Sequence, residues 1–341
     1  MKPDLIDHAD LQPSIDAIDE LVDNMANKLF AKGKITELHA DKPFETRLIH
    51  LEKQFAGCSV YLHKQPFQMP TAFQMLWGHK TLLDTVQQLI GPLIAGHPVW
   101  NLRTKVPSFT QATVPWHQDV AYLHEGCWSV LQPAAWVPLV DTNENNGCLR
   151  FAKKGHRSGR TALHTACWAD TWYVDLAADT AERTLGVDMR QTCDGGDVVT
   201  VPVPKGGAVL FNNLIPHQSL ENYSDGIRWS FDLRWQDPNS SSGFVGKPPI
   251  LMRDPTQPGM VPAWEQWLAG DQQLRASAGQ TADSTFDDEF NSLITGPWMQ
   301  QWEVTNSNRH TRAYTNMDDS ELWRTRTMKT AEEDDRRRNS V

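Results

Sequence analysis

The chain has 341 residues, of which 40% are hydrophobic and 22% charged, and its formal net charge is −10. Such a composition is typical of a folded, soluble protein with enough apolar material for a buried core. The excess of acidic residues argues against a nucleic-acid partner, because a phosphate backbone selects basic surfaces. No run of the sequence approaches the ~20 apolar residues that a membrane span needs.

The cysteines and the first residues indicate a compartment. The five cysteines are Cys58, Cys127, Cys148, Cys167 and Cys193, and no two form a Cys-x-x-Cys pair. This pattern fits a reducing environment and argues against a cysteine zinc site. The first residues lack the basic start and apolar stretch of a signal peptide. We therefore expect a cytoplasmic protein.

The N-terminal third has the apolar spacing of helices. Residues 14–33 repeat apolar side chains at a helical period and end at a glycine. Further helices are expected over 44–55 and over 80–90, and a Gly-Pro pair stops the second of these. Residues 1–13 are expected to form an irregular lead-in.

Strand patterns begin near residue 98. They cover 99–106, the segment around His117, 134–140, 148–151, 197–203, 208–211 and 227–235. In the last of these, apolar and polar residues alternate, which predicts a half-buried strand. Short strands separated by Gly, Asn and Pro turns favour an antiparallel sandwich or barrel such as a jelly roll. Residues 152–196 form a polar excursion with no clear period.

These patterns predict one domain over residues 1–330 and a short tail. Its parts are a helical segment at 14–92, a β core at about 98–236 and a C-terminal wrap at 237–330, which is first rich in Pro and Gly and then helical over 263–275. Residues 331–341 are a charge run that cannot bury a core, so we expect a solvated, flexible tail.

Three residues of the expected β core have the chemistry of metal ligands. On a strand, His117 and Asp119 would project to the same side and Gln118 away from them. His217 ends another apolar strand. Two histidines and one carboxylate form the facial triad of non-haem iron enzymes, which leaves coordination positions open. We therefore predict a metal site at His117, Asp119 and His217.

Arg228 follows His217 on the next expected strand. Iron held by three protein ligands still needs an oxidant and electrons, and a 2-oxo acid can chelate it through its keto and carboxylate oxygens. The far carboxylate of such an acid favours a planar, bidentate cation, which arginine supplies better than lysine. We expect Arg228 to bind that carboxylate, although a surface ion pair would also explain an arginine here.

Several motifs occur in a fixed order between residues 99 and 235. They are Trp116-His117-Gln118-Asp119 with Tyr122, Trp136 in Ala-Ala-Trp-Val-Pro-Leu, Asn145-Asn146-Gly147-Cys148-Leu149, Gly206-Gly207-Ala208-Val209-Leu210-Phe211, Pro216-His217-Gln218-Ser219, Asn222-Tyr223-Ser224 and Arg228. Together they resemble the phytanoyl-CoA dioxygenase family of iron(II)/2-oxoglutarate oxygenases. The resemblance implies a mainly β fold with flanking helices and a double-stranded β-helix (jelly-roll) core. It also implies Fe(II) at the triad, with 2-oxoglutarate and O₂ as co-substrates.

The resemblance implies roles for residues around the triad. Ser219 would help Arg228 to hold the far carboxylate of 2-oxoglutarate, and Trp136 would line the co-substrate site. Gln118 matches the residue that the family has between the first histidine and the aspartate. A turn hydroxyl and core packing are the alternative roles of Ser219 and Trp136. Because Asp119 is present, a halogenating variant, which replaces that carboxylate, is not expected.

Asn101 and Lys105 fall where the resemblance places co-substrate contacts. The family's usual Lys-Pro-Pro is replaced here by Lys105-Val106-Pro107, so the match at this position is incomplete.

Tyr122, His124 and Trp128 lie just past the triad and are candidates for substrate binding at the mouth of the site. Local loop packing is the alternative. Basic residues near the presumed mouth would suit an anionic substrate, or form a solvated face; they are Arg103, Lys153, Lys154 and Arg157.

We predict an enzyme that hydroxylates a C–H bond of a small molecule and releases succinate and CO₂. Two alternatives stay open. The same iron centre could give another outcome, such as desaturation, epoxidation or cleavage of a C–S or C–N bond. The chain could instead be a non-catalytic jelly-roll binding or sensing protein.

Overall fold

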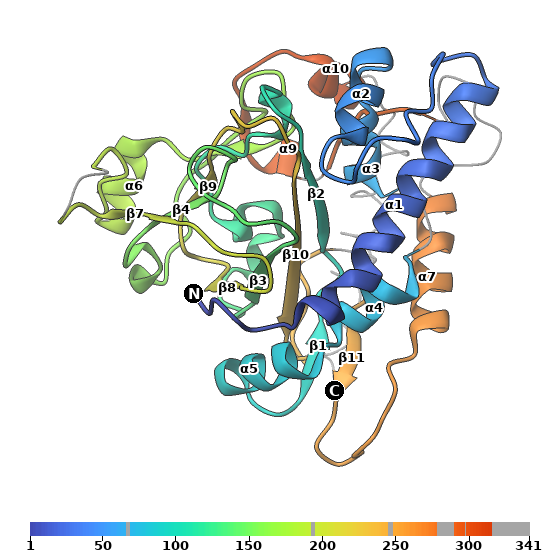
Figure 1. Cartoon of the computed structure of the whole chain (residues 1–341). Helices are drawn as coiled ribbons and strands as arrows, with labels where there is room; N and C mark the ends of the chain where they lie inside the picture. The colour runs from blue at the N-terminus through green and yellow to red at the C-terminus, as the bar shows by residue number, and fades with distance from the viewer. Residues whose placement is uncertain (66–68, 192–194, 245–247, 278–289, 297, 316–341) are drawn as a thin grey trace.

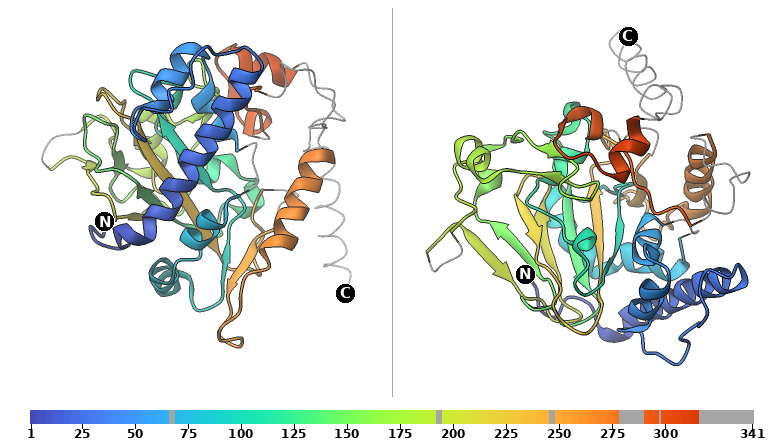
Figure 2. Two further views of the ribbon diagram at one scale, coloured as in Figure 1. Left: turned by 45° about the vertical axis from the view of Figure 1, so that its right-hand side comes forward. Right: turned by 90° about the horizontal axis from the view of Figure 1, so that it is seen from above.

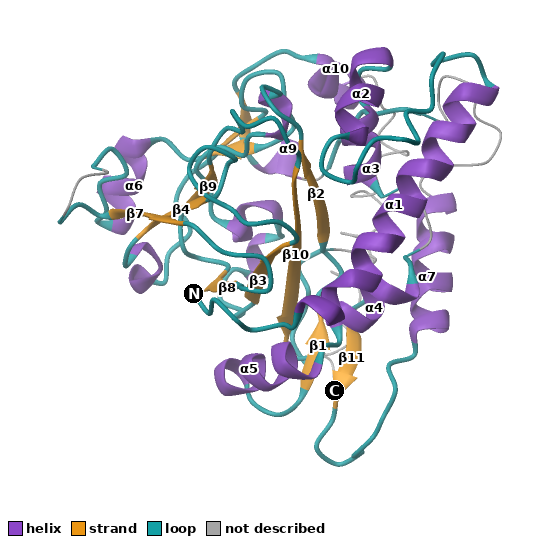
Figure 3. Cartoon of the chain, viewed as in Figure 1, coloured by secondary structure: helices purple, strands orange, loops and turns teal. Residues whose placement is uncertain are grey.

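Figure 1 shows the computed structural model of the chain, which describes residues 1–65, 69–191, 195–244, 248–277, 290–296 and 298–315. A six-stranded antiparallel sheet and a three-stranded one form its centre, and helices cover one face of the larger sheet (Figure 3). Antiparallel sheets with flanking helices, as expected, are confirmed. Within the described residues, no helix has the length and apolar character to traverse a bilayer.

The N-terminal helices pack on the larger sheet. They are α1 (His8–Ala31), α2 (Arg47–Gln54), α3 (Cys58–Lys64), α4 (Thr71–Trp77) and α5 (Lys80–Ile90). The helices predicted over 44–55 and 80–90 are confirmed as α2 and α5. The irregular lead-in predicted at 1–13 is wrong from His8 onward, where α1 begins. The fully buried Leu11 anchors the start of α1 in the core. Pro13 does not end the helix, because near the helix start it removes only one backbone donor. The sequence pattern misses α3 and α4 because each has only seven residues.

The larger sheet contains β1 (Ile94–Gly96), β2 (Asn101–Lys105), β3 (Pro133–Pro138), β8 (Val209–Asn212), β10 (Arg228–Gln236) and β11 (Ile250–Arg253). Its order is β11-β1-β10-β3-β8, and β2 pairs with β10 beside β1. In the β10–β2 ladder Arg228 lies opposite Lys105, and Asp232 lies opposite Asn101. The long strand β10 is therefore central, with partners along both edges.

The sequence predicts β10 to be half-buried, and this is wrong: all nine of its residues are buried. Its apolar residues, Trp229, Phe231, Leu233 and Trp235, belong to the main hydrophobic core with α1, α4 and α5. Its polar residues, Arg228, Ser230, Asp232 and Arg234, are 0–7% exposed and occupy the opposite face. One face of β10 therefore packs in the apolar core, and the other lines a second buried region that is polar.

The smaller sheet has the order β7-β4-β9, with β4 (Leu149–Ala152), β7 (Val198–Val201) and β9 (His217–Ser219). The polar excursion at 152–196 is more ordered than its lack of period suggests. It contains β5 (Thr165–Ala166), β6 (Val174–Asp175) and α6 (Ala178–Leu185), with a small apolar cluster of its own.

The segment around His117 is not a regular strand. His117 makes an isolated antiparallel bridge with His217, in which the two residues exchange backbone hydrogen bonds of 3.0 and 2.9 Å. The chain then turns into a short 3₁₀ helix, η2 (Asp119–Tyr122). The predicted strand is therefore wrong beyond Gln118.

The C-terminal part forms α7 (Trp264–Ser277), α9 (Trp298–Gln301), β12 (Glu303–Val304) and α10 (Arg309–Thr315). The helix predicted over 263–275 is confirmed as α7. Figure 2 shows α9 and α10 at one end of the sheets, away from the side that α1 and α7 cover. There β12 pairs with β5. The tail predicted at 331–341 lies outside the described residues.

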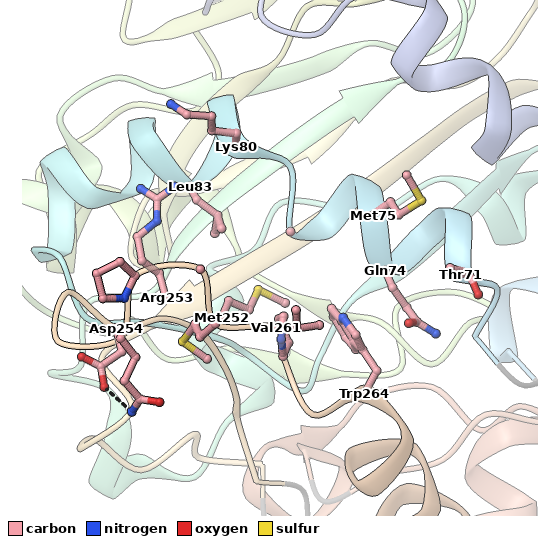
Figure 4. A pocket seen from close by; sticks show the side chains of 16 residues that line it. Thr71, Gln74, Met75, Lys80, Leu83, Met252, Arg253, Asp254, Val261 and Trp264 are labelled. Atoms are coloured by element: carbon pink, nitrogen blue, oxygen red, sulfur yellow. Dashed lines mark hydrogen bonds between the residues drawn. The ribbon is translucent and has the colours of Figure 1, made fainter.

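A surface groove of about 580 Å³ lies between α4, α5 and the loop after β11 (Figure 4). Met75, Met252, Val261 and Trp264 form its apolar lining, with Arg253 at one end. It shares no residue with the polar interior of the sheets.

Candidate metal centre

The predicted triad is assembled in the buried space between the two main sheets. Nε2 of His117 lies 3.5 Å from Oδ1 of Asp119, and Nε2 of His217 lies 3.8 Å from the same oxygen. The candidate ligand atoms all lie within 4.8 Å of one another, and the three residues are buried. Two imidazole nitrogens and one carboxylate oxygen around one point form the donor set of a facial triad.

Backbone contacts orient both imidazoles toward this point. Nδ1 of His117 lies 2.9 Å from the carbonyl oxygen of Pro115, and Nδ1 of His217 lies 3.1 Å from that of Ile215. A carbonyl oxygen only accepts hydrogen bonds, so each Nδ1 carries the proton and each Nε2 presents a lone pair. A metal-binding histidine characteristically donates its other N–H in this way.

The ionisation states also suit a cation. Burial, and then the neighbouring His117, lowers the pKa of His217 to about 3, so its imidazole is neutral. Burial by itself would raise the pKa of Asp119. The Arg234 guanidinium, together with the two histidines, outweighs burial and holds this pKa well below its usual range.

Arg234 is a site residue that sequence reasoning missed. Its Nε and Nη2 atoms lie 3.0 and 2.9 Å from Oδ2 of Asp119. Beside it on the same face of β10, Asp232 accepts a 2.7 Å hydrogen bond from Nε of Arg103. The alternating polar residues of 227–235 include Arg234, but this face of the strand was expected to meet solvent.

Arg228 is buried with donor capacity to spare. One guanidinium nitrogen donates to Oγ of Ser230 at 2.5 Å, and Cζ lies 5.3 Å from the centre of the Trp136 ring. Among the described residues its Nε has no hydrogen-bond partner. Burial lowers the pKa of Arg228 to about 10, so the group remains a cation at neutral pH. An incompletely satisfied buried guanidinium is the complement of an anionic ligand.

Lys105 is the cross-strand neighbour of Arg228 and is 2% exposed. Its Nζ donates to the Leu220 carbonyl at 2.5 Å and lies 3.4 Å from Oγ1 of Thr113. Burial, and then the charges of Arg228 and Arg103, lowers the pKa of Lys105 well below its usual value. The interior therefore gathers basic groups at one end of β10.

The remaining predicted co-substrate residues differ in their surroundings. Ser219 is buried, and its Oγ accepts a 3.0 Å hydrogen bond from the backbone N–H of Val114. Asn101 lies at the other end of β2 from Lys105. Gln118 points away from the triad, as expected. Its side-chain amide donates to the carbonyls of Arg160 and Leu214 and accepts from the N–H of Ala162, and these bonds fix the loop after β4.

The three residues suggested for the substrate mouth are not equivalent. Tyr122 lies closest to the triad, with its ring 5.8 Å from the His117 ring. His124 caps a short 3₁₀ helix, η3 (Glu125–Cys127), because its Nδ1 accepts from the N–H of Gly126. Trp128 stacks on Trp302 at 5.7 Å. His124 thus contacts its own loop, whereas Trp128 packs against the C-terminal segment.

The C-terminal segment adds aromatic residues that the sequence did not suggest. The Trp298 ring lies 5.3 Å from the Tyr122 ring, and its Nε1 donates to the carbonyl of Trp172. Nε1 of Trp302 donates to the carbonyl of Ala121 at 2.7 Å, so this segment packs directly on η2. Of the basic residues suggested near the mouth, Arg103 lies in the interior, whereas Lys153, Lys154 and Arg157 are exposed.

Comparison with known sequences identifies a family. Residues 14–230 match the sequence model of the phytanoyl-CoA dioxygenase (PhyH) family, which is more than half of the chain. The chain belongs to the phytanoyl-CoA dioxygenase family.

Curated relatives are similar over shorter stretches. Phytanoyl-CoA dioxygenase domain-containing protein 1 of Danio rerio is 31% identical over 112 residues, which is 33% of this chain and 35% of that protein. The protein of the same name from Rattus norvegicus is 27% identical over 154 residues, covering 45% of this chain and 48% of the relative. The chain thus matches half or less of the length of these relatives.

Among solved structures, the apo form of the non-haem monooxygenase ThoJ has a similar fold. The TM-score is 0.51 with 20% sequence identity, and the match covers 74% of this chain and 79% of that one. At this identity the likeness concerns the fold alone.

Proposed function

We propose that the chain is an iron(II)- and 2-oxoglutarate-dependent dioxygenase with a jelly-roll core. The observation that carries this proposal is the buried His117–Asp119–His217 set, in which two Nε2 atoms and one carboxylate oxygen face one point. Membership of the phytanoyl-CoA dioxygenase family supports it. The jelly roll is supported by an apolar cluster that joins the larger sheet, through Trp136 and Val209, to the β7-β4-β9 sheet, through Leu149 and Phe151.

In this proposal the triad would hold Fe(II), and Arg228 with Lys105 would bind the far carboxylate of 2-oxoglutarate. When bound, iron and 2-oxoglutarate supply the activation of O₂ and the electrons for substrate oxidation, and 2-oxoglutarate leaves as succinate and CO₂. The Nε of Arg228, which no described residue pairs, and the adjacent Trp136 ring support the carboxylate site. Ser219 contributes by fixing the strand that carries His217 to Val114.

The protein's own contribution is orientation and exclusion of water. The Nδ1 contacts of both histidines fix the direction of their lone pairs before any ligand arrives. The Tyr122 ring, against which the Trp298 ring packs, places aromatic surface beside His117, which restricts the approach of solvent. We expect the outcome to be hydroxylation of a C–H bond, and product analysis by mass spectrometry separates it from desaturation, epoxidation or C–S and C–N cleavage.

We further propose a small-molecule substrate with an anionic group. A cavity of about 20 Å³, too small by itself for an organic substrate, borders the basic end of the interior; its lining places the Arg103 guanidinium among the rings of Phe109, Trp172 and Tyr173. A guanidinium framed by aromatic rings favours a small organic anion over a polymer. A substrate screen that yields only neutral or cationic substrates would argue against this assignment.

The experiment that tests the proposed function is anaerobic. Fe(II) and then 2-oxoglutarate are added, and the visible charge-transfer absorption of the complex is recorded for the wild type, His217→Ala and Arg228→Ala. We expect a band that needs both additions, disappears in His217→Ala and requires more 2-oxoglutarate in Arg228→Ala. Absence of the band from a wild-type protein that is folded by circular dichroism would refute the proposal and favour a non-catalytic binding protein.

A further inference from the structure

The two oxygens of Asp119 have different partners. Oδ1 faces the two histidines, at 3.5 Å from Nε2 of His117 and 3.8 Å from Nε2 of His217. Oδ2 is bonded to Arg234, whose Nε lies at 3.0 Å and whose Nη2 lies at 2.9 Å. One guanidinium therefore engages a single carboxylate oxygen with a charge-assisted hydrogen bond from Nε and an ion-pair contact from Nη2.

Arg234 is itself held in place. It is 6% exposed and belongs to the central strand β10, where its backbone carbonyl accepts from the N–H of His97. Its Nη1 donates to the carbonyl of Val99 at 3.4 Å, and its Nη2 lies 3.9 Å from a carboxylate oxygen of Asp232. Asp232 is in turn fixed by Arg103. The guanidinium thus approaches Asp119 from a rigid support.

This arrangement restricts how Asp119 can bind a cation. A free carboxylate can use one or both oxygens as ligands, but Oδ2 accepts the hydrogen bond from Nε of Arg234 and is covered by the same guanidinium through Nη2. Oδ1 is left as the ligand. With two histidines and one oxygen, three coordination positions of the metal remain open, whereas a bidentate Asp119 would leave only two.

We propose that Arg234 is a positioning residue that keeps Asp119 a one-oxygen ligand and so preserves the open positions of the metal. The inference rests on the proposed metal site and deepens it. Arg234 lies beyond residue 230, where the match to the family ends, so the family motifs do not assign this role. Arg234 contacts the triad at Oδ2 of Asp119.

The test uses Co(II) as a spectroscopic probe of coordination, with no turnover. The variants are Arg234→Met, which removes the donors, and Arg234→Lys, which keeps the charge but cannot direct two donors to Oδ2. Arg228→Met is the matched control, because it removes a buried arginine from the same face of β10. The Co(II) dissociation constant and the d–d absorption at saturation are measured for each folded protein.

We expect Arg234→Met to weaken Co(II) binding by at least about 10-fold and to change the shape and intensity of the d–d absorption. Arg234→Lys should show the same spectral change with a smaller loss of affinity, and Arg228→Met should match the wild type in both. If Arg234→Met does not fold, Arg234→Lys decides the question.

Three results would overturn the inference. They are a wild-type spectrum in Arg234→Met, full recovery of the spectrum and affinity in Arg234→Lys, and equal effects of Arg234→Met and Arg228→Met. Full recovery in Arg234→Lys would mean that only the charge of Arg234 matters. Equal effects of the two methionine variants would mean that any buried cation on this face acts in the same way. Failure of the wild type to bind Co(II) or Fe(II) is a separate outcome, because it refutes the metal site itself.

Discussion

Replacing Trp302 by alanine is expected to destabilise the protein by about 3–5 kcal/mol, the usual range for truncating a buried tryptophan. Trp302 is 8% exposed and packs in the aromatic cluster at the end of the sheets. Its ring lies parallel to Trp128 at 5.7 Å, and its Nε1 donates to the Ala121 carbonyl at 2.7 Å. The substitution therefore creates a cavity and leaves that carbonyl without its indole donor.

The assay is urea unfolding followed by far-ultraviolet circular dichroism. Trp302→Phe is the matched variant: it keeps an aromatic ring against Trp128 but loses the N–H donor, so we expect a loss of only about 1–2 kcal/mol. Ala121 lies in η2, which begins with Asp119. We therefore also expect Trp302→Ala to weaken Co(II) binding more than Trp302→Phe does.

The reasoning would be refuted by a free energy of unfolding of Trp302→Ala within about 1 kcal/mol of the wild type. It would equally be refuted if Trp302→Ala lost stability without any change in Co(II) affinity, because the indole would then support the fold but not the turn that carries Asp119.

Three further predictions concern the triad, the basic end of the interior and the buried histidines. Asp119→Ala should abolish substrate-dependent succinate release, and activity like that of the wild type would contradict the triad. Gly147→Ala should lower stability, measured by urea unfolding, and 2-oxoglutarate affinity, measured by calorimetry. Gly147 has φ +88°, and a Cβ there would lie 2.6 Å from Cδ of Lys105. Unchanged affinity would show that this turn does not contribute to the co-substrate site. Burial lowers the pKa of His97 to about 4 and of His164 to about 3, from 6.5. The contribution of these two histidines to the free energy of unfolding is therefore fully present above pH 6.5. It should be lost as the pH drops toward 4, because the histidines of the unfolded chain take up protons at a higher pH than those of the folded protein. Equal urea midpoints at pH 7 and pH 5 would contradict this.

The iron-ligand candidates could be found from sequence because their chemistry does not depend on exact secondary structure. His117 and Asp119 were placed on one face of a strand, yet the chain turns into η2 after Gln118. The two side chains still converge, because the bridge between His117 and His217 fixes one and the turn redirects the other. The predicted cluster is therefore present, although the regular strand from which it was predicted ends at Gln118.

Arg234 shows what periodicity alone cannot predict. Alternation in 227–235 correctly separates two faces of a strand, but it does not say whether the polar face meets water or a second sheet. That depends on the tertiary fold: β10 has partners on both edges, and its polar face is buried and meets Asp119 through Arg234. A run of alternating charges on the strand that follows a ligand histidine is thus better interpreted as the lining of an interior.

The contribution of the C-terminal segment could not be predicted because it depends on contacts between residues far apart in the chain. Nothing near Trp302 in the sequence indicates Ala121 as its partner. Local patterns identify helices such as α7, but they carry no information about which surface a short aromatic segment covers.

The packing of Trp302 on η2 has a consequence for synthesis of the protein. His117, Asp119 and His217 all leave the ribosome well before Trp302, and chains acquire structure from the N-terminus during translation. The growing chain can therefore bring its three ligand residues together while the turn that carries Asp119 is still uncovered. Translation order thus leaves a period in which the three ligand residues have been synthesised and the aromatic segment that packs on η2 has not.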